Sequence, residues 1–320
     1  MVARPSIAVI GAGNMGSLHT RVTAQAAGCD LVAVVDVNPD LGRALAERYN
    51  TQWLPELGSL QGIDGVIVAA ATPAHRDLAL EIIRAGVPLL VEKPVADNLS
   101  HTEEVLDAAA AAGVPIMCGF VERYNPAVIA ARSIVDAPVY VSSTRHGPYA
   151  PRITTGVSWD LLVHDVDLAV QVLGNDIAGV KADRGYFHPS SRSGAEDTVD
   201  AVIQFASGAV ASVSASRISQ IKIRTMSIHE IDRMVEIDLL RRNVTIYRHV
   251  EHSNVTLDGD GYRQQTIIEI PEILNQVEPL AGQLTHFLGL IDGSVDADVE
   301  RAGILPAHRV VDAVQRSAGG

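Results

Sequence analysis

The stretch IAVIGAGNMGSLHT, residues 7–20, joins a short apolar run to a helix-like run through three glycines. Gly11, Gly13 and Gly16 have the G-x-G-x-x-G spacing of a dinucleotide-binding turn. The first glycine allows a tight turn, the second lets a pyrophosphate approach the backbone, and the third lets the helix pack closely on the strand. Free N–H groups at the start of the helix then face the anion. We therefore predict a nucleotide-binding unit, in which Asn14 and Met15 also contact the cofactor.

A carboxylate follows at the distance that such a unit requires. The next apolar run, LVAVVD at 31–36, ends in Asp36, 20 residues after Gly16. Asp36 can accept hydrogen bonds from the adenosine ribose hydroxyls, and its charge repels a 2′-phosphate. We therefore expect NAD, with NADP less favoured, although neighbours such as Asn38 can modify this preference. The alternative is a glycine-rich turn without a ligand.

Strand-like and helix-like segments continue to alternate up to about residue 119. Short apolar runs at 65–70, 87–91 and 114–119 are typical of parallel strands buried on both faces, and a short strand is expected near 51–54. Helices are expected at about 74–85 and 99–112. Together with the first two runs, this pattern predicts the six parallel strands of a doubly wound Rossmann domain, which we place at residues 1–122.

Two segments lie beyond the carboxyl ends of these strands, where doubly wound sheets bind their ligands. After the fourth strand comes ATPAH, 71–75, and after the fifth comes VEKPV, 91–95. The cofactor residues expected here are Ala70, Thr72, Pro73, His75, Glu92, Lys93 and Pro94. We predict a cis bond before Pro94. A solvated loop lysine would be the simpler interpretation of Lys93 if the Rossmann pattern were absent.

After about residue 123 the pattern changes to that of an antiparallel sheet with few helices. A strand at about 139–146 precedes a helix at roughly 157–173, and strand-like runs joined by short turns follow at 198–218, 221–230, 233–239, 243–248 and 265–269. Helical regions are expected at about 276–293 and 303–317. We place a second α/β domain at 123–320, with a C-terminal helix able to pack on the first domain. The exposed face of its sheet favours a subunit interface.

The helix GVSWDLLVHDVDLAVQVLG, 156–174, carries a carboxylate and an imidazole one turn apart. Asp160 and His164 share one face, so the carboxylate can orient the imidazole and raise its basicity. Hydride transfer from a secondary alcohol needs a base for the hydroxyl proton, and histidine, with an ordinary pKa of about 6.5, suits this role. An isolated pair of this kind is more often a surface pair, and Asp165 and Asp167 make the helix acidic in any case.

Taken together, GAGNMGSLHTR, ATPAH, EKP and WDLLVHDVD, in this order and spacing, resemble the Gfo/Idh/MocA family of oxidoreductases. The resemblance covers nearly the whole chain. It implies a Rossmann domain, an α/β domain with a large, open, mostly antiparallel sheet, and homodimers or homotetramers built through that sheet. It also implies oxidation or reduction of a sugar or cyclitol carbon by a catalytic group of Lys93, Asp160 and His164. Lys93 would stabilise a developing alkoxide and relay a proton.

Two further segments are similar to the branch that oxidises carbon 3 of UDP-N-acetylglucosamine: CGFVERYNPAV, 118–128, and TRHGPYAPRI, 144–153. Arginine can hold a diphosphate with two hydrogen bonds, and tyrosine can stack on a uracil. The candidate substrate residues are Arg123, Tyr124, Asn125, Arg145, Tyr149 and Arg152. The alternative for them is structural ion pairing. The chain departs from the family before the aspartate, where TTGVSWD holds a single glycine and the bulky Trp159 can narrow the pocket.

Two other functions stay open at this point. One is a dehydrogenase of a cyclitol or free sugar, and the other is a non-catalytic NAD-binding regulator on the same fold. The presence of all three catalytic residues favours an enzyme, since a regulator needs none of them. A keto acid that reoxidises NADH within the site, as in some relatives, is also compatible with the sequence.

Composition excludes several other classes of protein. The net charge of −13 argues against a nucleic-acid binder, which needs a basic surface. No apolar run approaches the roughly 18–20 residues of a membrane span, and a strand starts too early for a signal peptide. Two cysteines, Cys29 and Cys118, favour a reducing compartment, and we expect a cytoplasmic protein. The remaining histidines show no metal-ligand pattern, and we expect no metal.

Overall fold

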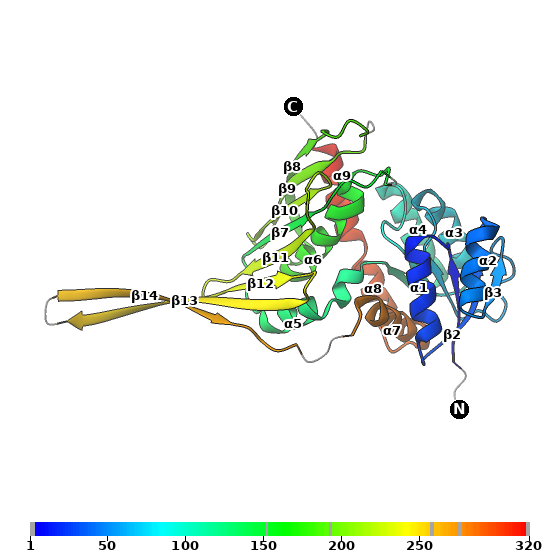
Figure 1. The fold of residues 1–320 in the computed structure, drawn as a ribbon, viewed down its shortest axis with the longest axis horizontal. Helices are drawn as coiled ribbons and strands as arrows, with labels where there is room; N and C mark the ends of the chain where they lie inside the picture. The colour runs from blue at the N-terminus through cyan, green and yellow to red at the C-terminus, as the bar shows by residue number, and fades with distance from the viewer. Residues whose placement is uncertain (1–3, 152, 192–193, 257–258, 274–276, 318–320) are drawn as a thin grey trace. The chain divides into compact units, whose positions relative to one another are not determined.

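The computed structural model describes residues 4–151, 153–191, 194–256, 259–273 and 277–317. The chain forms two compact units (Figure 1). The first contains the chain up to Tyr124 together with Val277–Asp312, and the second contains Asn125–Gln276 together with the residues from Ala313 onward. The first boundary lies close to the expected one. The segment Val277–Asp312, which the sequence placed in the second domain, belongs to the first unit.

The first unit is built on a parallel sheet of six strands. Their order is β3-β2-β1-β4-β5-β6, and each neighbouring pair is parallel. The strands are β1 (Ser6–Ile10), β2 (Asp30–Val35), β3 (Gln52–Leu54), β4 (Gly65–Val68), β5 (Leu89–Val91) and β6 (Ile116–Cys118). The order reverses between β1 and β4, so the carboxyl ends of these strands border the crevice in which such sheets bind nucleotides. The predicted doubly wound sheet is confirmed.

Helices connect these strands, and their ends follow from local capping. They are α1 (Asn14–Gln25), α2 (Pro39–Arg48), α3 (Thr72–Arg84), α4 (Leu99–Ala112) and the short η1 (Val121–Tyr124). Asn38 and Asn98 accept hydrogen bonds from the first backbone N–H groups of α2 and α4. Gly113, with φ of +65°, ends α4 in the left-handed conformation that glycine adopts most easily.

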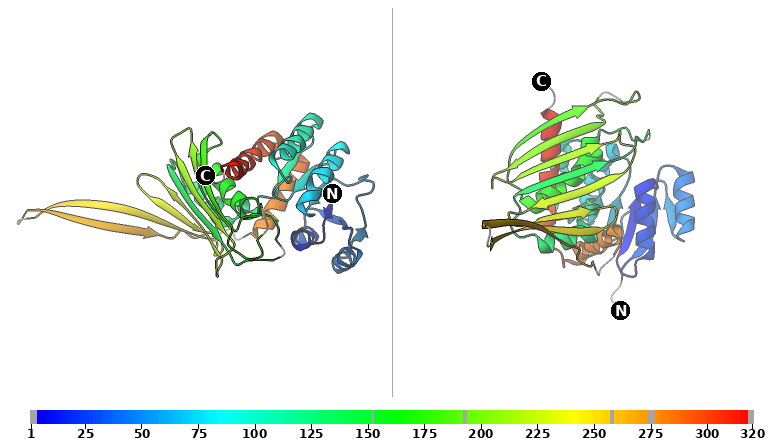
Figure 2. Two further views of the ribbon diagram at one scale, coloured as in Figure 1. Left: turned by 90° about the horizontal axis from the view of Figure 1, so that it is seen from above. Right: turned by 60° about the vertical axis from the view of Figure 1, so that its left-hand side comes forward.

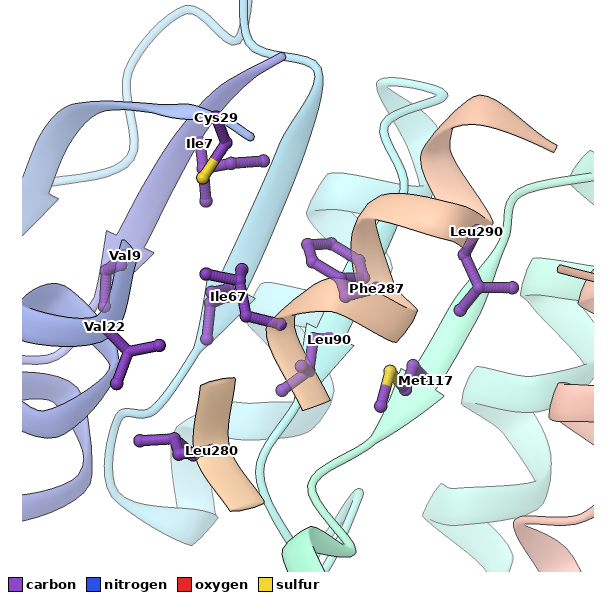
Figure 3. Close-up of a cluster of buried hydrophobic side chains, with 11 residues drawn as sticks. Ile7, Val9, Val22, Cys29, Ile67, Leu90, Met117, Leu280, Phe287 and Leu290 are labelled. Carbon is purple, nitrogen blue, oxygen red and sulfur yellow. The ribbon is translucent and has the colours of Figure 1, made fainter. Parts of the chain in front are cut away.

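The core of the first unit includes a helix from the far end of the chain. α7 (Pro279–Asp292) places Leu280, Phe287 and Leu290 against the strand residues Ile67 and Leu90 (Figure 3). All five side chains are buried, and burial of each contributes about 1.5–3 kcal/mol. Two further helices follow, α8 (Ala297–Ala302) and α9 (Leu305–Arg316), and the first unit ends at Asp312 within α9.

The second unit is built on a mostly antiparallel sheet of eight strands, as expected. Their order is β14-β13-β12-β11-β7-β10-β9-β8, and only the pair β7–β10 is parallel among the described pairs. The strands are β7 (Tyr140–His146), β8 (Ile177–Gly185), β9 (Thr198–Phe205), β10 (Val210–Ser216), β11 (Ile223–His229), β12 (Met234–Asp238), β13 (Asn243–Thr256) and β14 (Gly259–Glu269). β8 was not predicted from the sequence, and β13 and β14 extend beyond their expected limits as a two-stranded ribbon (Figure 1).

Helices cover one face of this sheet, and the opposite face carries small polar residues. The covering segments are α5 (Pro126–Ile134), a π-helical turn at Ser158–Leu162, and α6 (Val163–Leu173) (Figure 2). Burial alternates along β7, so that Ser143 is buried and Ser142 is half-buried. Ser212 and Ser227 pair with Ser142 across the sheet. The second face is therefore rich in hydroxyl groups.

Candidate active site

The glycine turn between β1 and α1 has the backbone that a pyrophosphate needs. Gly11 has φ of +101°, and a Cβ atom there would lie 2.5 Å from the carbonyl oxygen of Ala69. At Gly16 a Cβ atom would lie 1.8 Å from the carbonyl oxygen of Gly11, so both positions require glycine. A Cβ atom at Gly13, the N-cap of α1, would meet no described atom within 4 Å. The start of α1 therefore opens onto space that an anion can enter.

Asp36 follows β2 at the same edge of the sheet. Its carboxylate accepts hydrogen bonds from the backbone N–H groups of Ala12 (2.5 Å) and Asn38 (2.7 Å). The side chain is half-buried, and each oxygen keeps a further lone pair for a ribose hydroxyl. Of the other two residues expected here, Asn14 is exposed at the first position of α1, and Met15 packs against the core of the unit. This edge of the sheet fits NAD.

The next four predicted cofactor residues lie between β4 and α3 or in the first turn of α3. Ala70 precedes α3, and Thr72 and Pro73 are its first two residues. His75 is 1% exposed, and its two ring nitrogens face two backbone carbonyl oxygens. Nδ1 lies 2.8 Å from the carbonyl oxygen of Pro94, and Nε2 lies 3.0 Å from that of Ala70. The imidazole therefore lies between the ends of two neighbouring strands, and in its neutral form it can donate to one of these two oxygens.

Glu92, Lys93 and Pro94, together called the EKP turn, follow β5. Glu92 is buried, and its Oε1 lies 2.8 Å from Nε2 of His19 on α1. Its Oε2 accepts a hydrogen bond from the backbone N–H of Lys93 (3.2 Å). The Lys93 side chain is half-buried, and the bond between Lys93 and Pro94 is cis, as predicted. Only glycine fits at Gly119, where a Cβ atom would lie 2.7 Å from the Glu92 carboxyl carbon.

A third histidine, His308 on α9, contacts the residue that follows the EKP turn. The backbone N–H of Val95 donates to His308 Nε2 (3.2 Å), so the ring proton lies on Nδ1 and is donated to the carbonyl oxygen of Ile304 (2.9 Å). Burial lowers the pKa of His308 to about 4; the hydrogen bond to Ile304 opposes this shift, and the charge of Arg123 adds to it. The ring is therefore neutral at neutral pH. No sequence motif marks this residue, which is 213 positions from its partner.

In the second unit, Asp160 and His164 lie on the helix expected to carry them, but this helix is not uniform. It begins with a π-helical turn over Ser158–Leu162, which includes Asp160, and continues as α6, whose second residue is His164. Single π turns inside helices occur frequently at functional sites. Both side chains are half-buried. A carboxylate and an imidazole are thus placed about one helical turn apart.

A buried carboxylate that sequence reasoning missed holds the start of this helix. Glu196 is fully buried, and its Oε1 accepts hydrogen bonds from the backbone N–H of Ser158 (2.8 Å) and from the Gln315 side chain (3.1 Å). A negative charge is favourable at the N-terminus of a helix. At Gly156, a Cβ atom would lie 2.3 Å from the Glu196 carboxylate. The single glycine before the aspartate is therefore required by packing.

Arg145, a predicted substrate residue, forms a buried ion pair within the second unit. It is 2% exposed on β7, and its Nε donates to the carboxylate of Asp165, which is 0% exposed. The Ser143 hydroxyl donates to the same carboxylate (2.5 Å). Because Asp165 follows His164 in the chain, this pair attaches α6 to the sheet beside the candidate base. These contacts are those of a structural ion pair, which was the alternative to a substrate role for Arg145.

Tyr149 stacks on a histidine of the second unit. The rings of Tyr149 and His188 have centroids 3.5 Å apart and planes 6° apart, and the Arg217 guanidinium lies 5.2 Å from the Tyr149 ring. Arg217 also forms an ion pair with Asp197 (2.8 Å). Burial would raise the pKa of Asp197, but hydrogen bonds from a serine, two backbone N–H groups and Arg217 hold it well below its usual range. Arg152 lies outside the described residues.

Three predicted substrate residues lie at the point in the sequence where the first unit ends and the second begins. Each has contacts within its own unit. Arg123 pairs with Glu300 of α8 (3.3 Å). The ring of Tyr124 lies 5.4 Å from an imidazole of α7. The Asn125 side chain accepts a hydrogen bond at the start of α5 and donates to the carbonyl oxygen of Leu239 (3.1 Å). The substrate role of all six candidates therefore stays a prediction.

The predicted residues thus divide between the units. The glycine turn, Asp36, the β4–α3 turn and the EKP turn lie at one edge of the first sheet, whereas Asp160 and His164 lie on one helix of the second unit. Among the described residues, no group of three or more metal-ligating side chains is placed to hold an ion. No helix in the same part of the chain is long and apolar enough to span a membrane.

Comparisons with known proteins agree with this geometry. Residues 6–120 match the GFO/IDH/MocA family, described as oxidoreductases with an NAD-binding Rossmann fold, and residues 128–232 match the C-terminal domain of the same family. The expectation of an NAD-binding Rossmann domain is confirmed.

Two curated relatives and one solved structure illustrate the range of similar enzymes. An inositol 2-dehydrogenase of Rhizobium meliloti is 25% identical over 97% of this chain and 95% of its own length. A UDP-N-acetylglucosamine 3-dehydrogenase of Acidithiobacillus ferrooxidans is 28% identical over 88% and 87%, respectively. The solved structure of UDP-N-acetylglucosamine 3-dehydrogenase GnnA from that organism has a TM-score of 0.82, with 25% identity over 99% of both chains.

Proposed function

The chain belongs to the GFO/IDH/MocA family of NAD-dependent oxidoreductases that act on CH–OH groups, and from this we propose that it oxidises carbon 3 of a UDP-N-acetylhexosamine to a ketone. The observation that carries the substrate is the likeness to UDP-N-acetylglucosamine 3-dehydrogenase GnnA over 99% of both chains. The segments that contain Arg123 and Arg145 are the sequence features that support it.

The proposed reaction divides the work between the two units. NAD, when bound, supplies the acceptor for the hydride of the carbinol C–H bond. The open N-terminus of α1 would bind the pyrophosphate, and Asp36 would hold the adenosine ribose. These residues belong to the first unit, in which the glycine turn and Asp36 lie at one edge of the sheet.

His164 is proposed as the general base. It takes the hydroxyl proton as the C–H bond breaks, so one alcohol gives one ketone, one NADH and one proton. Asp160 is proposed to orient the imidazole and stabilise its charged form. Lys93 is proposed to donate to the reacting oxygen and stabilise its developing negative charge. Lys93 belongs to the first unit, and Asp160 and His164 belong to the second.

The test is the appearance of NADH when the purified protein is mixed with NAD and UDP-N-acetylglucosamine, with myo-inositol and glucose in parallel. We expect NADH with the nucleotide sugar alone, and about 10²–10⁴-fold lower kcat for His164→Ala, the contribution usual for a general base. Lys93→Ala should also lower kcat, by about 10²–10³-fold. Lys181→Ala, at an exposed lysine of β8, serves as the matched control.

A dehydrogenase of a cyclitol or free sugar is the second candidate. The likeness to inositol 2-dehydrogenase over 97% of the chain favours it. NADH formation with myo-inositol or glucose, and none with UDP-N-acetylglucosamine, would replace the proposed substrate and keep the enzyme class. If no NADH appears with any of the three, a keto acid is added, because a tightly bound NADH would then be reoxidised in the site.

A non-catalytic NAD-binding regulator is the candidate from another class. Such a protein would bind NAD, and its NAD affinity would not change measurably when Lys93 or His164 is replaced. Its chain needs neither residue, whereas this chain has both, with Asp160 one turn before the histidine. The regulator is therefore the less favoured function.

A further inference from the structure

Three buried histidines surround the EKP turn, and they come from three different helices of the first unit. His19 on α1, His75 on α3 and His308 on α9 are each at most 2% exposed. Their contacts fall on three of the four residues 92–95, namely the Glu92 side chain, the Pro94 carbonyl oxygen and the Val95 backbone N–H. We call these three residues the imidazole clamp. Lys93 lies between the residues that the clamp holds.

Each contact satisfies a polar group that proline or burial would leave without a partner. Pro94 has no backbone N–H, so its carbonyl oxygen is its only polar group, and His75 lies within hydrogen-bond distance of it (2.8 Å). The N–H of Val95 is buried and donates to the neutral ring of His308. An unmade hydrogen bond is costly in such surroundings, so a shift of the backbone that follows Lys93 would break contacts with these two rings.

The third contact acts through a carboxylate. His19 holds one oxygen of Glu92 (2.8 Å), and the other oxygen accepts the backbone N–H of Lys93 (3.2 Å). Gly119 leaves space for this buried carboxylate, which a Cβ atom at that position would meet. The backbone of Lys93 is thereby fixed on its amino side by Glu92, and the two residues after it are fixed by His75 and His308.

We propose that the imidazole clamp positions Lys93 for hydride transfer, with His75 and His308 as positioning residues and His19 acting through Glu92. The inference rests on the proposed function, because it assigns Lys93 a task at the reacting hydroxyl. The three rings touch no reacting atom. They set the place from which the lysine side chain extends. A misplacement of about 1 Å at a reacting group can lower a rate by about 10²-fold.

The kinetic experiment compares two substitutions at each of two clamp positions. His308→Leu and His75→Leu remove the polar contacts while keeping an apolar side chain of similar size. His308→Gln and His75→Asn keep groups able to donate and accept hydrogen bonds. We expect kcat to fall about 10- to 100-fold in the leucine variants, with the NADH dissociation constant changed less than about threefold. The amide variants should recover most of kcat.

Coupling to Lys93 separates positioning from general damage. If the clamp acts through Lys93, His308→Leu combined with Lys93→Ala should be about as slow as Lys93→Ala alone. Val105→Ala, a core truncation in α4 of the same unit, is the control. Its effect on kcat should multiply with that of Lys93→Ala. If the effect of a leucine variant on kcat also multiplied with that of Lys93→Ala, the proposal would be overturned.

A second measurement does not depend on turnover. The chain has three lysines, and Lys181 and Lys222 are both exposed, so they serve as internal references for acylation of Lys93 read by mass spectrometry. We expect the rate for Lys93, relative to both references, to rise in the two leucine variants and to keep its wild-type ratio in the amide variants and Val105→Ala. An unchanged ratio in the leucine variants contradicts the clamp. If the wild-type protein oxidises no sugar, the proposed function fails and this ratio alone decides the inference.

Discussion

At the scale of single residues, Asp36 is the group expected to choose the cofactor. Its carboxylate follows β2 and lies beside the glycine turn. Asp36→Ala removes hydrogen bonds to a charged group, each worth about 1.5–3 kcal/mol, so kcat/KM for NAD should fall about 10- to 100-fold. The value for NADP should fall less, because the charge that repels its phosphate is gone. Initial rates with both cofactors test this, and Asp40→Ala, exposed on α2, is the control.

His308 predicts a pH dependence of stability. Burial lowers its folded-state pKa to about 4, below the unfolded value of about 6.5, so the folded state favours the neutral ring. At a pH between these two pKa values, the unfolded chain therefore binds one proton more than the folded protein. The free energy of unfolding should be highest above about pH 6.5 and should decrease by about 1.4 kcal/mol per pH unit down to about pH 4.

Denaturant titrations across this pH range measure that decrease. The variant His308→Gln should flatten it, whereas His249→Gln, at an exposed histidine of β13, should leave it unchanged. Asp197 does not contribute in this window. Its folded-state pKa is depressed, so its stabilisation is lost only as the pH falls below the unfolded value of about 3.9. An equal slope in wild type and His308→Gln would contradict the assignment.

The buried pair of Arg145 and Asp165 predicts a large loss of stability. Asp165→Asn leaves the guanidinium buried without its carboxylate, which costs about 3–5 kcal/mol. The exposed pair of Arg301 and Asp298 is the matched comparison, since the Asp298 side chain is 82% exposed. Asp298→Asn should change stability by less than about 1 kcal/mol. Urea unfolding of both variants measures the difference, and similar losses would show that burial does not set the effect.

At the scale of elements, the π-helical turn depends on Gly156. A Cβ atom there would lie 2.3 Å from the Glu196 carboxylate, so Gly156→Ala must displace Glu196 or the start of the helix that carries Asp160. We expect a lower melting temperature together with a changed emission of Trp159, which lies within this turn. Gly147→Ala meets no described atom within 4 Å and should leave both unchanged. Unaltered emission in Gly156→Ala would show that the turn tolerates the extra atom.

The elements that sequence reasoning recovered are those with strong local patterns. The apolar runs of β1, β2 and β5 end at glycine or a charged residue, and that of β4 ends shortly before Thr72 and Pro73, so their place and type were predictable. The strand β8, IAGVKADRG, mixes small and charged residues and lacks a long apolar run. The π turn was also missed, because one widened turn leaves the spacing of Asp160 and His164 unchanged.

Contacts between distant positions explain the rest of what sequence could not predict. Glu196 is 38 residues from Ser158, and His308 is 213 residues from Val95. Neither residue belongs to a motif. Each forms a hydrogen bond with a backbone N–H, and because almost every residue has this group, the partner's identity gives no signal in the sequence. Asp36 was predicted because nucleotide binding requires an acid at a set distance from the glycines, and Lys93 because its segment follows the fifth strand and matches the family motif.

At the scale of the whole molecule, we propose a homodimer or homotetramer built through the open face of the second sheet. Ser142, Ser212 and Ser227 lie side by side on this face. Ser142→Arg with Ser212→Arg would place two unpaired charges in that interface and should convert the oligomer to monomers. Light scattering after gel filtration measures the mass. An unchanged oligomer, or a wild-type monomer, would remove this face as the interface.

The split of the first unit in the sequence has a consequence for synthesis on the ribosome. The strand residues Ile7, Ile67 and Leu90 are made early, but the helix that covers them, Pro279–Asp292, follows only after Asn125–Gln276. At about 5–20 residues per second, the intervening chain takes roughly 10–30 s to translate. During that interval the nascent sheet exposes an apolar face to solvent or to a chaperone. A message truncated before residue 277 would release a chain in which that face stays permanently uncovered.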